Sequence, residues 1–595
     1  MNNLKNKIIS ILNLFNKGEK QKALNEISLL IDSNKKNLDL LFLQAQMFIQ
    51  INQIDKAIYS LKKILNLDPE NIKALELTYG NYLKKYKYDH AENYIDKLLN
   101  IGSKKYELLR DKAFLEYLKK NYEDSRKFIE HAIQINKNDV FGLNILGLIY
   151  MEQNKIADGI KIFQKAISIN PNYGDSYNNL GKCLIDIEKL NEAYICFKKA
   201  NRINPNSDLS FINIANILSI KDKNKLAIKF YKKAKKINPD NQITDQNIAL
   251  IYCKLKNIDW VKKFYQKQKD LGIFNSEFIL GYSYLLLNKK KFKEAFDLFE
   301  SRLKTKDFPK KNQNHTNVMK NFNSSNKIEL NSKILIVKEQ GVGDEVLFSS
   351  LYNDLLKKHK NVKIECDKRL LKIFERSFKK DIFFPFGYFS SSKNKLGSFD
   401  KILYAGSLTK YYRKKEQDFN INPYLKTNKE VDNNIKLKLE KFKNTKKIGI
   451  SWKSVINIYG NLKSLKISDF ERLFSKNRTL INLQYGNTDQ EIKYLKDKGK
   501  NIFSFKNIDL FNDFESLLSI LKNLDIFVTV SNSSAHFAGA LGVPTILICP
   551  KKSSTYYYWD YENGKTPWYK SVSIVKFKNS TEYTMNLVND LINKA

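Results

Sequence analysis

A pattern of small residues that returns every 34 positions constrains the fold of this chain more than any other feature of its sequence. Gly147, Gly181 and Ala215 occupy equivalent positions in three aligned segments, and an Asn-Pro pair closes each segment. One position of the repeat holds a small residue in nearly every copy, with a single valine: Ala23, Ala57, Ala91, Ser125, Gly159, Ala193, Ala227, Val261 and Ala295. Agreement over so many steps of one length predicts an array of stacked, similar structural units.

The residue types explain how one unit folds. Each copy reads as two antiparallel helices, because small residues let helix backbones approach closely while larger apolar residues fill the seams. The Asn-Pro pair ends the second helix, since proline lacks an N–H donor and disfavours helix at the preceding residue. One unit cannot bury its own apolar face, so stacking provides the core and curves the array into a superhelix with a concave groove. We expect this α-solenoid over residues 5–307, in about nine repeats.

The 34-residue step and its residue pattern resemble the tetratricopeptide repeat. The resemblance implies a surface that binds a peptide or protein, or that presents one to an attached catalytic domain. Tyr177, Asn178 and Asn179 are candidates for the lining of the groove. The alternative for these three residues is that they belong to the core of the array or cap a helix.

The sequence changes character after the array. Residues 308–331 are polar, rich in Asn and Lys and without periodicity, which predicts a linker. From residue 332 onward, apolar runs of strand length alternate with helical patterns, as is typical of parallel sheets. Two sets of these elements predict two Rossmann-like lobes, at residues 332–430 and 431–595, with a cleft between them. Ligands of such sheets bind at the carboxyl ends of the strands, where two motifs occur.

The first motif, Gly341-Val342-Gly343-Asp344, lies between an expected strand and an expected helix. Its glycines permit a tight turn and a close approach of a ligand to the backbone. The dinucleotide-binding fingerprint is excluded, because Val346 stands where that pattern requires a third glycine. Asp344 either caps the helix or directs its carboxylate into the cleft, where it can accept a proton from an acceptor hydroxyl.

The second motif runs from Ser531 through Asn532, Ser533 and Ser534 to His536. It joins the end of an expected strand to the start of a helix. Free N–H groups, hydroxyls and the positive end of the helix dipole suit this turn to a diphosphate. The alternatives are ordinary capping by the serines and a histidine packed in the core.

Four segments, in this order, resemble glycosyltransferase family 9, the ADP-heptose:lipopolysaccharide heptosyltransferases, and more closely its relatives that carry tetratricopeptide repeats. The segments are KILIVKEQGVGDEVLFSS, IGISWK, INLQYG and DIFVTVSNSSAHFAGALGVPTILICP. The resemblance extends over residues 332–580 and implies a two-lobed GT-B fold, with a nucleotide-diphosphate sugar as donor and neither metal nor further cofactor. It also implies that Asp344 is the general base. The residues that it places at the donor and its diphosphate are Gly341, Gly343, Lys463, Ser531, Asn532, Ser533, Ser534 and His536.

Two further features bear on the donor site. A set of residues after the LINLQY run either contacts the nucleotide or ribose or forms the solvated start of a helix: Gly486, Asn487, Asp489 and Glu491. The chain departs from the family pattern at Ser531-Asn532, where the family commonly has Asp-Thr, so it lacks one carboxylate of the expected donor pocket.

Two functions are compatible with these patterns. The first is a glycosyltransferase that moves a sugar from its nucleotide donor to a protein or glycan acceptor recruited by the groove of the array. The alternative is a non-catalytic scaffold for protein interaction, in which Ser531-Asn532 marks a degenerate transferase domain.

The composition adds limits on partners and compartment. Lys+Arg 103 against Asp+Glu 63 gives a net charge of +40, which suits either an anionic partner or a general drift toward lysine. The lysines are spread along the chain without a nucleic-acid motif, so we expect no nucleic-acid partner. Five scattered cysteines favour a reducing compartment. No apolar run reaches the ~18 residues of a membrane span. We therefore expect a cytoplasmic protein, with the inner face of the cytoplasmic membrane as a place of peripheral association.

Overall fold

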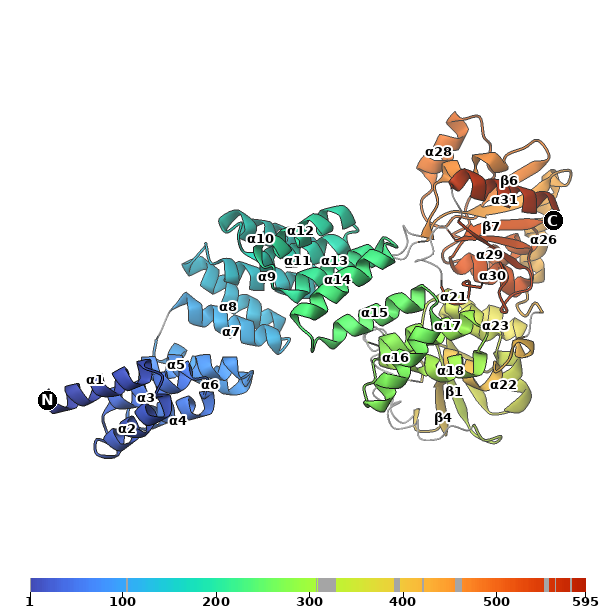
Figure 1. The fold of residues 1–595 in the computed structure, drawn as a ribbon. Helices are drawn as coiled ribbons and strands as arrows, with labels where there is room; N and C mark the ends of the chain where they lie inside the picture. Colours follow the sequence, from blue (N-terminus) through green and yellow to red (C-terminus); the bar gives the residue numbers. More distant parts are fainter. Residues whose placement is uncertain are drawn as a thin grey trace. The chain divides into compact units, whose positions relative to one another are not determined.

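The chain folds into two compact units, Met1–Ser210 and Phe211–Ala595 (Figure 1). The border between them falls inside the repeat array rather than at its end. Most of the expected linker at 308–331 lies outside the residues that the structure describes. The computed structural model describes residues 2–102, 105–305, 308, 328–389, 396–419, 422–454, 463–549, 556–561, 563–577 and 580–594.

The first unit is a stack of helix pairs, which confirms the expected tetratricopeptide-like solenoid. Within a pair the two helices pack along each other, as α7 does on α8, α9 on α10 and α11 on α12. Short turns of similar conformation join them. The helices are α1 (Asn2–Asn16), α2 (Lys20–Asp32), α3 (Leu38–Gln50), α4 (Ile54–Leu67), α5 (Ile72–Lys84), α6 (Tyr88–Asn100), α7 (Tyr106–Leu118), α8 (Tyr122–Ile135), α9 (Val140–Glu152), α10 (Ile156–Ile169), α11 (Gly174–Asp186) and α12 (Leu190–Ile203).

The glycines of the repeat lie where an aromatic ring of the second helix meets the first. A Cβ on Gly147 would come within 2.5 Å of Phe163 Cε1, and a Cβ on Gly181 within 2.6 Å of Phe197 Cε1. Both phenylalanines are fully buried. The small residues are therefore required by packing, because a ring fills the space that a side chain would need.

A second periodic feature of the array was not anticipated from its sequence. The turn between the two helices of a pair contains a residue of left-handed conformation. In the first pair this residue is Gly18, with φ at +94°, and in the eight later pairs it is not glycine and its φ lies between +56° and +68°. A left-handed residue commonly ends a helix by turning the chain away from its axis. The positions again differ by 34 residues: Asn52, Tyr86, Lys120, Asn154, Glu188, Asp222, Lys256 and Lys290.

The second unit begins with the remaining helices of the array. The chain enters it within α13 (Asp208–Ile220). The helices that follow are α14 (Asn224–Ile237), α15 (Gln242–Lys254), α16 (Ile258–Asp270), α17 (Ser276–Asn288), α18 (Phe292–Phe299) and the 3-10 turn η1 (Glu300–Lys304).

Two parallel sheets follow, as expected from the alternation of strands and helices. The first has the order β3-β2-β1-β4 and the second the order β6-β5-β7-β8-β9, and every strand pair in them is parallel. The first sheet contains β1 (Ile334–Val337), β2 (Val362–Cys366), β3 (Phe383–Pro385) and β4 (Lys401–Tyr404). The second contains β5 (Lys446–Ser451), β6 (Arg478–Asn482), β7 (Ile526–Val530), β8 (Thr545–Cys549) and β9 (Val572–Lys576).

Helices cover both sheets, and two of them carry the sequence motifs at their first turns. These two are α21 (Val342–Ser349), which follows β1, and α30 (Ser533–Leu541), which follows β7, and they pack on each other. The other helices are α22 (Tyr352–Lys358), α23 (Leu371–Ser377), α25 (Leu408–Tyr412), α26 (Lys429–Leu439), α28 (Asp489–Asp497), α29 (Phe514–Lys522) and α31 (Thr581–Lys594).

The end of the array and the first sheet share one core. Arg302 of η1 is almost fully buried and donates to both carboxylate oxygens of Glu339, which follows β1, at 3.2 and 2.8 Å. The same guanidinium donates to Ser407 Oγ at 2.9 Å. Tyr284 of α17 stacks on Tyr557 at 4.9 Å between ring centroids. The last array helices are therefore built into the α/β region of their unit.

Candidate functional site

The two sequence motifs meet at the carboxyl ends of the strands. β1 lies between β2 and β4, and β7 lies next to β5, so both motifs follow strands near the positions where the strand order reverses. Gly343 of α21 lies against the first turns of α30. A Cβ on Gly343 would be 3.0 Å from His536 Cδ2 and 3.5 Å from Ser533 Cα. Glycine therefore allows the two helix starts to come together.

Asp344 does not cap its helix, so the simple capping interpretation is wrong. Gly341 occupies the N-cap position of α21, which has no side-chain cap hydrogen bond. The Asp344 carboxylate is half-buried and faces the side-chain amide of Gln340, oriented with its nitrogen toward the carboxylate. That amide donates to the two carboxylate oxygens at 3.1 and 3.3 Å.

The surroundings of Asp344 favour its protonated form. Burial, followed by repulsion from Glu339, raises the pKa of Asp344 to about 7. The backbone of Gly341 and the charge of Lys463 act in the opposite direction without cancelling this effect. A carboxyl group with a pKa near neutrality can both accept and release a proton at physiological pH.

Lys463 supplies a positive charge to the same place. Its side chain is buried, and Nζ lies 3.6 Å from the centroid of the Tyr556 ring, a cation–π contact. Burial lowers the pKa of Lys463 to about 8, and the nearby Asp344 carboxylate opposes this shift. The structure thus brings together Asp344 and Lys463, which are far apart in the sequence.

At the start of α30, both ends of the Asn532 side-chain amide are used in hydrogen bonds within the fold. Its Oδ1 accepts from the backbone N–H of Ala535 at 3.2 Å, so Asn532 is the N-cap of the helix. Its Nδ2 donates to Ser451 Oγ at 2.8 Å at the end of β5. The neighbouring Ser531 and Ser534 are buried, and Ser533 is half-buried. The cap of α30 is therefore Asn532, whereas the sequence suggested capping by the serines.

His536 is enclosed by aromatic rings. Its Nδ1 lies 3.0 Å from Tyr569 OH, and its ring centroid is 4.9 Å from those of both Tyr558 and Trp559. Burial lowers the pKa of His536 to about 3. The imidazole is therefore neutral at physiological pH and can take part in hydrogen bonds only as an uncharged ring.

The third group of predicted residues follows β6, which is the strand that pairs with β5. Gly486 has a left-handed backbone, with φ at +85°. Asn487 Oδ1 accepts from the backbone of Asp489 at 2.8 Å, and Asp489 is the exposed first residue of α28. Glu491 forms an ion pair with Lys453, which follows β5. Asn487 and Asp489 thus match the interpretation as a solvated helix start.

The groove residues proposed in the array are part of its core. Tyr177, Asn178 and Asn179 are all buried. Asn179 Nδ2 donates to Asn144 Oδ1 at 3.1 Å in the preceding repeat. Asn178 Oδ1 accepts from Ser210 Oγ at 3.4 Å in the following repeat. These amides connect neighbouring repeats, which is the core alternative named above.

Sequence reasoning missed most of the residues that surround the site. The missed residues include Gln340, Glu339 and a dense aromatic segment near the end of the chain. The signal for that segment is visible in the sequence, because aromatic residues fill half of positions 556–569: Tyr556, Tyr557, Tyr558, Trp559, Tyr561, Trp568 and Tyr569. Their partners could not be read from the sequence, because the contacts join distant segments.

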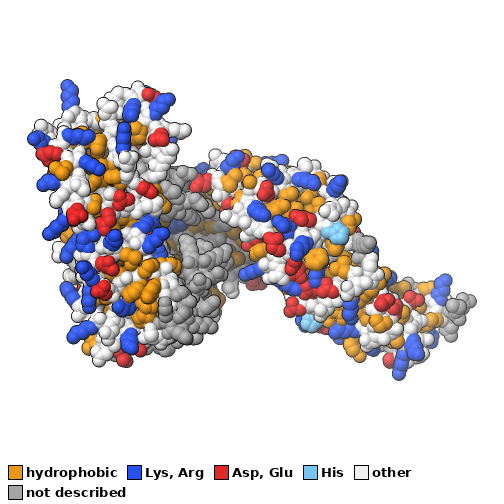
Figure 2. All heavy atoms as spheres, turned by 180° about the vertical axis from the view of Figure 1, so that it is seen from behind, with side chains coloured by type: hydrophobic (Ala, Val, Ile, Leu, Met, Phe, Trp, Pro, Cys, Tyr) orange, Lys and Arg blue, Asp and Glu red, His pale blue; other side chains and the backbone are white. Residues whose placement is uncertain are grey.

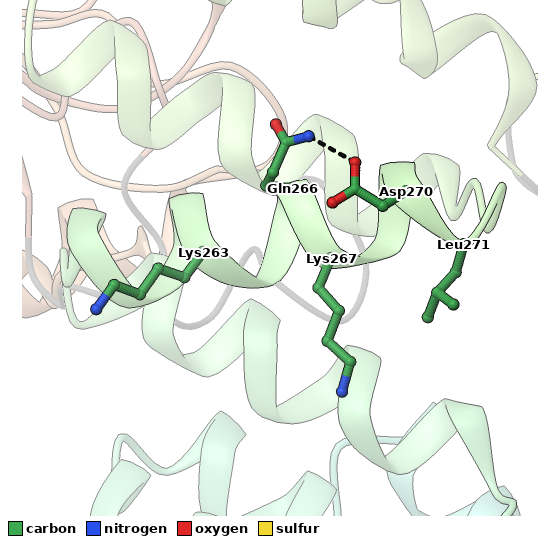
Figure 3. Close-up of a pocket in the computed structure, with 5 residues that line it drawn as sticks. All are labelled: Lys263, Gln266, Lys267, Asp270 and Leu271. Atoms are coloured by element: carbon green, nitrogen blue, oxygen red, sulfur yellow. Dashed lines mark hydrogen bonds between the residues drawn. The ribbon is translucent and has the colours of Figure 1, made fainter.

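Other features of the described residues offer no competing site. No group of His, Cys, Asp and Glu with the geometry of a metal site occurs among them. A surface hollow of about 430 Å³ is lined by residues of α16 and the turn after it. Gln266 donates to Asp270 at 2.7 Å, and the other lining side chains point away from this pair (Figure 3). On the face seen in Figure 2, lysine and arginine side chains are scattered among acidic ones rather than gathered in one patch.

Comparison with known proteins assigns the repeats. The tetratricopeptide repeat family matches residues 142–173, 162–194 and 210–241. The chain carries tetratricopeptide repeats. Protein FlbA of Caulobacter vibrioides (strain ATCC 19089 / CIP 103742 / CB 15) is 27% identical over 259 residues, which are 40% of this chain and 42% of FlbA. The chain thus spans less than half the length of this relative.

Solved structures of repeat proteins show a weaker likeness. A tetratricopeptide repeat protein from Parabacteroides merdae has a TM-score of 0.38 at 16% identity, over 42% of this chain and 99% of its own. PilF of Pseudomonas aeruginosa has a TM-score of 0.31 at 17% identity, over 35% and 95%. Within the described residues, no helix is long and apolar enough to cross a membrane.

Proposed function

We propose that residues 332–595 form a metal-independent glycosyltransferase of the GT-B type, of the hexosyl or heptosyl class. It transfers a sugar from a nucleotide-diphosphate sugar to an acceptor hydroxyl. The observation that carries this proposal is the position of Asp344. Its carboxyl group, with a pKa of about 7, lies beside the meeting point of two helix starts, close to a buried lysine.

The reaction assigns one role to each part of the site. The acceptor oxygen attacks the anomeric carbon of the sugar, and the bond from that carbon to the diphosphate oxygen breaks. The hydroxyl proton passes to the Asp344 carboxylate. The departing diphosphate takes the electron pair and is stabilised by the free N–H groups of α30 and by Lys463. Gly343 keeps the two helix starts close enough for both events to occur at one place.

The repeats supply the acceptor. Tetratricopeptide arrays bind peptides and proteins along their stacked helices. The last helices of this array share a core with the first sheet, and Arg302 and Tyr284 of the array contact residues near Asp344. We infer that a protein or glycan held by the array is delivered to the site, in the cytoplasm or at the inner face of the cytoplasmic membrane.

Nucleotide binding is the first test. The full chain is heated with ADP, UDP, GDP and CMP and with their sugars, and unfolding is followed by fluorescence. A ligand at 100 times its Kd adds about 2.7 kcal/mol to the free energy of unfolding. The proposal requires at least one of these compounds to raise Tm. If none does so at millimolar concentration, it is wrong.

Turnover separates the base from a structural aspartate. Asp344→Asn removes the proton acceptor and keeps the shape of the side chain, so we expect donor hydrolysis or transfer to fall by about 10²–10⁴-fold. Nucleotide binding should remain, because Asp344 is not among the groups proposed to hold the diphosphate. If Asp344→Asn lost both turnover and nucleotide binding, the role of Asp344 would be only structural.

A second function is favoured by one observation. Asn532 is used as the N-cap of α30 and as a bridge to β5, and the preceding Ser531 stands where the family pattern has a carboxylate. A chain that lost donor binding would keep such a cap and serve as a protein-interaction scaffold. Absence of nucleotide binding together with an intact protein partner would favour this alternative.

A further inference from the structure

A short aromatic turn, residues 556–561, is packed between the last repeats of the array and the proposed donor site. Two successive hydrogen bonds close its backbone. The N–H of Trp559 donates to the carbonyl of Tyr556 at 2.9 Å. The N–H of Asp560 donates to the carbonyl of Tyr557 at 3.4 Å. Because each bond spans three residues and the two overlap, we expect the aromatic turn to move as one piece.

One side of the aromatic turn is held by the array. The Asp560 carboxylate accepts from Lys256 Nζ at 3.1 Å, in the link between α15 and α16. The Asp560 backbone carbonyl accepts from Nδ2 of Asn288, the buried last residue of α17. The ring of Tyr557 stacks on Tyr284 of α17, with 4.9 Å between centroids and 8° between planes. Two repeats thus contribute three contacts to this side.

The other side of the aromatic turn contacts the proposed donor site. The ring centroids of Tyr558 and Trp559 each lie 4.9 Å from that of His536. The ring of Tyr556 carries Lys463 Nζ at 3.6 Å from its centroid. His536 and Lys463 come from distant segments of the chain, and the aromatic turn is a neighbour of both.

We propose that Asp560 is a positioning residue for donor binding, held in place by Lys256 and Asn288 of the array. Through the aromatic turn, Asp560 fixes His536 and Lys463, the two side chains that we place at the nucleotide-diphosphate sugar. Groups that bind a ligand must keep their geometry to within about 0.5 Å, so a shift of the turn weakens binding. The array therefore shapes the donor site in addition to recruiting an acceptor.

This inference rests on the proposed function, and two substitutions in the array test it. Lys256→Met and Asn288→Leu each remove one polar contact between the array and Asp560. Asp560 keeps an ion pair on the other side, because Lys576 at the end of β9 donates to its carboxylate at 2.9 Å. We therefore expect the double variant to have a larger effect than Lys256→Met alone.

The first measurement is the affinity of the full chain for the compound that raises Tm most among ADP, UDP, GDP, CMP and their sugars. In the double variant Lys256→Met with Asn288→Leu we expect Kd to rise about 2–30-fold, the range for substitutions that link two coupled sites. Lys256→Arg keeps the charge and should bind as the wild type does. Equal Kd values for the wild type and the double variant would overturn the proposal.

Lys290→Met is the matched control. Lys290 has the same place in the next repeat, with φ at +57° against +58° for Lys256. It also forms an ion pair with the α/β region, but its partner Glu416 lies outside the aromatic turn. We expect Lys290→Met to leave Kd unchanged. If Lys290→Met weakened binding as much as Lys256→Met, the role given to the aromatic turn would be wrong.

The position of the aromatic turn can also be read without a ligand. The C–H protons of His536 lie among the rings of Tyr558, Trp559 and Tyr569, so ring currents displace their NMR signals. The full chain is labelled with ¹³C-histidine, and His536→Gln identifies the signal among five histidines. We expect the double variant to move this signal and Lys290→Met to leave it in place. A double variant with lower Tm and an unmoved signal would show a purely structural role and contradict the proposal.

The two proposals fail in different ways. If no nucleotide or nucleotide sugar binds while the His536 signal moves in the double variant, the connection through the aromatic turn stands and the proposed function is wrong. If a compound binds equally well to the wild type and the double variant, the transferase survives and the positioning role of Asp560 is wrong.

Discussion

Asp344 is a carboxyl group in surroundings that disfavour its charged form, and its proposed role as a base requires that charged form. Its carboxyl group lies in a crowded place with Glu339 nearby, and it must still lose a proton to act as a base. The raised pKa means that the folded chain binds this proton more tightly than the unfolded chain does. Ionisation of Asp344 at neutral pH therefore lowers the stability of the fold.

The sign of this effect can be measured. Between about pH 4 and 7 the folded state holds more protons at Asp344 than the unfolded state, so its contribution to stability falls as pH rises. We expect Asp344→Asn to raise Tm relative to the wild type at pH 8 and to change it little at pH 4. The measurement is the difference in Tm between the two chains at each pH.

Asp367 provides the opposite case as a control. Burial acts to raise the pKa of Asp367, but hydrogen bonds from Arg369 outweigh it and lower this pKa to about 2. The contribution of Asp367 to stability is present above about pH 4 and is lost as pH falls through the folded pKa. Asp367→Asn should therefore lower Tm at pH 8 and lose its effect at low pH. Equal behaviour of the two variants would contradict the assignment of Asp344.

Single residues show how far sequence reasoning reached into the site. Asp344 and His536 could be found because each lies in a short motif between a strand and a helix. Lys463 could be placed only by resemblance, and the contact of Lys463 with Tyr556 could not be predicted at all. Such contacts depend on the path of the chain between distant segments, which no local pattern records.

At the scale of elements, glycine is required by packing in one helix of the array and has open space beside it in another. Gly181 in α11 faces the ring of Phe197, with space for no further atom, and Phe197 is fully buried. A Cβ added to Gly80 in α5 would meet no atom within 4 Å. Both glycines are inside helices, where alanine is intrinsically preferred.

The two alanine variants should therefore differ in sign. Gly80→Ala should stabilise the array by about 0.5–1 kcal/mol, the gain from replacing a helical glycine. Gly181→Ala should destabilise it by about 1–3 kcal/mol, because the methyl group displaces a packed ring. Circular dichroism during chemical denaturation of the full chain measures both. Stabilisation by Gly181→Ala would contradict the packing argument.

At the scale of the molecule, the last turn of the repeat array is packed into the α/β region that follows it. Within the unit Phe211–Ala595, Arg302 of the last turn is buried against Glu339, Ser407 and a backbone carbonyl of the array. Removing one partner of a buried ion pair leaves the other charge without compensation, which costs about 3–5 kcal/mol. This contact therefore makes the final repeat a structural part of the α/β region.

We expect Arg302→Met to lower the free energy of unfolding of the second unit by about 3–5 kcal/mol. The double change Arg302→Met with Glu339→Gln should recover most of this loss. Tryptophan fluorescence during denaturation reports this unit, because all four tryptophans of the chain lie within it: Trp260, Trp452, Trp559 and Trp568.

The matched control is an exposed ion pair between the same regions. Lys290 Nζ of the array lies 2.6 Å from Glu416 Oε1 of the α/β region, and both side chains are exposed. Lys290→Met should change stability by no more than about 1 kcal/mol. Equal costs for Arg302→Met and Lys290→Met would contradict the role given to burial.

The sequence by itself determined the solenoid and the parallel sheets, because both depend on patterns that repeat within a few tens of residues. A 34-residue period and the alternation of strand and helix signals are local, and each is repeated often enough to exclude other folds. The tertiary structure alone decided the border of the compact units, the burial that raises the pKa of Asp344, and the aromatic rings that enclose His536. These depend on which distant side chains share a dry space, and the free energy of a charge or proton there is set by all of its neighbours together.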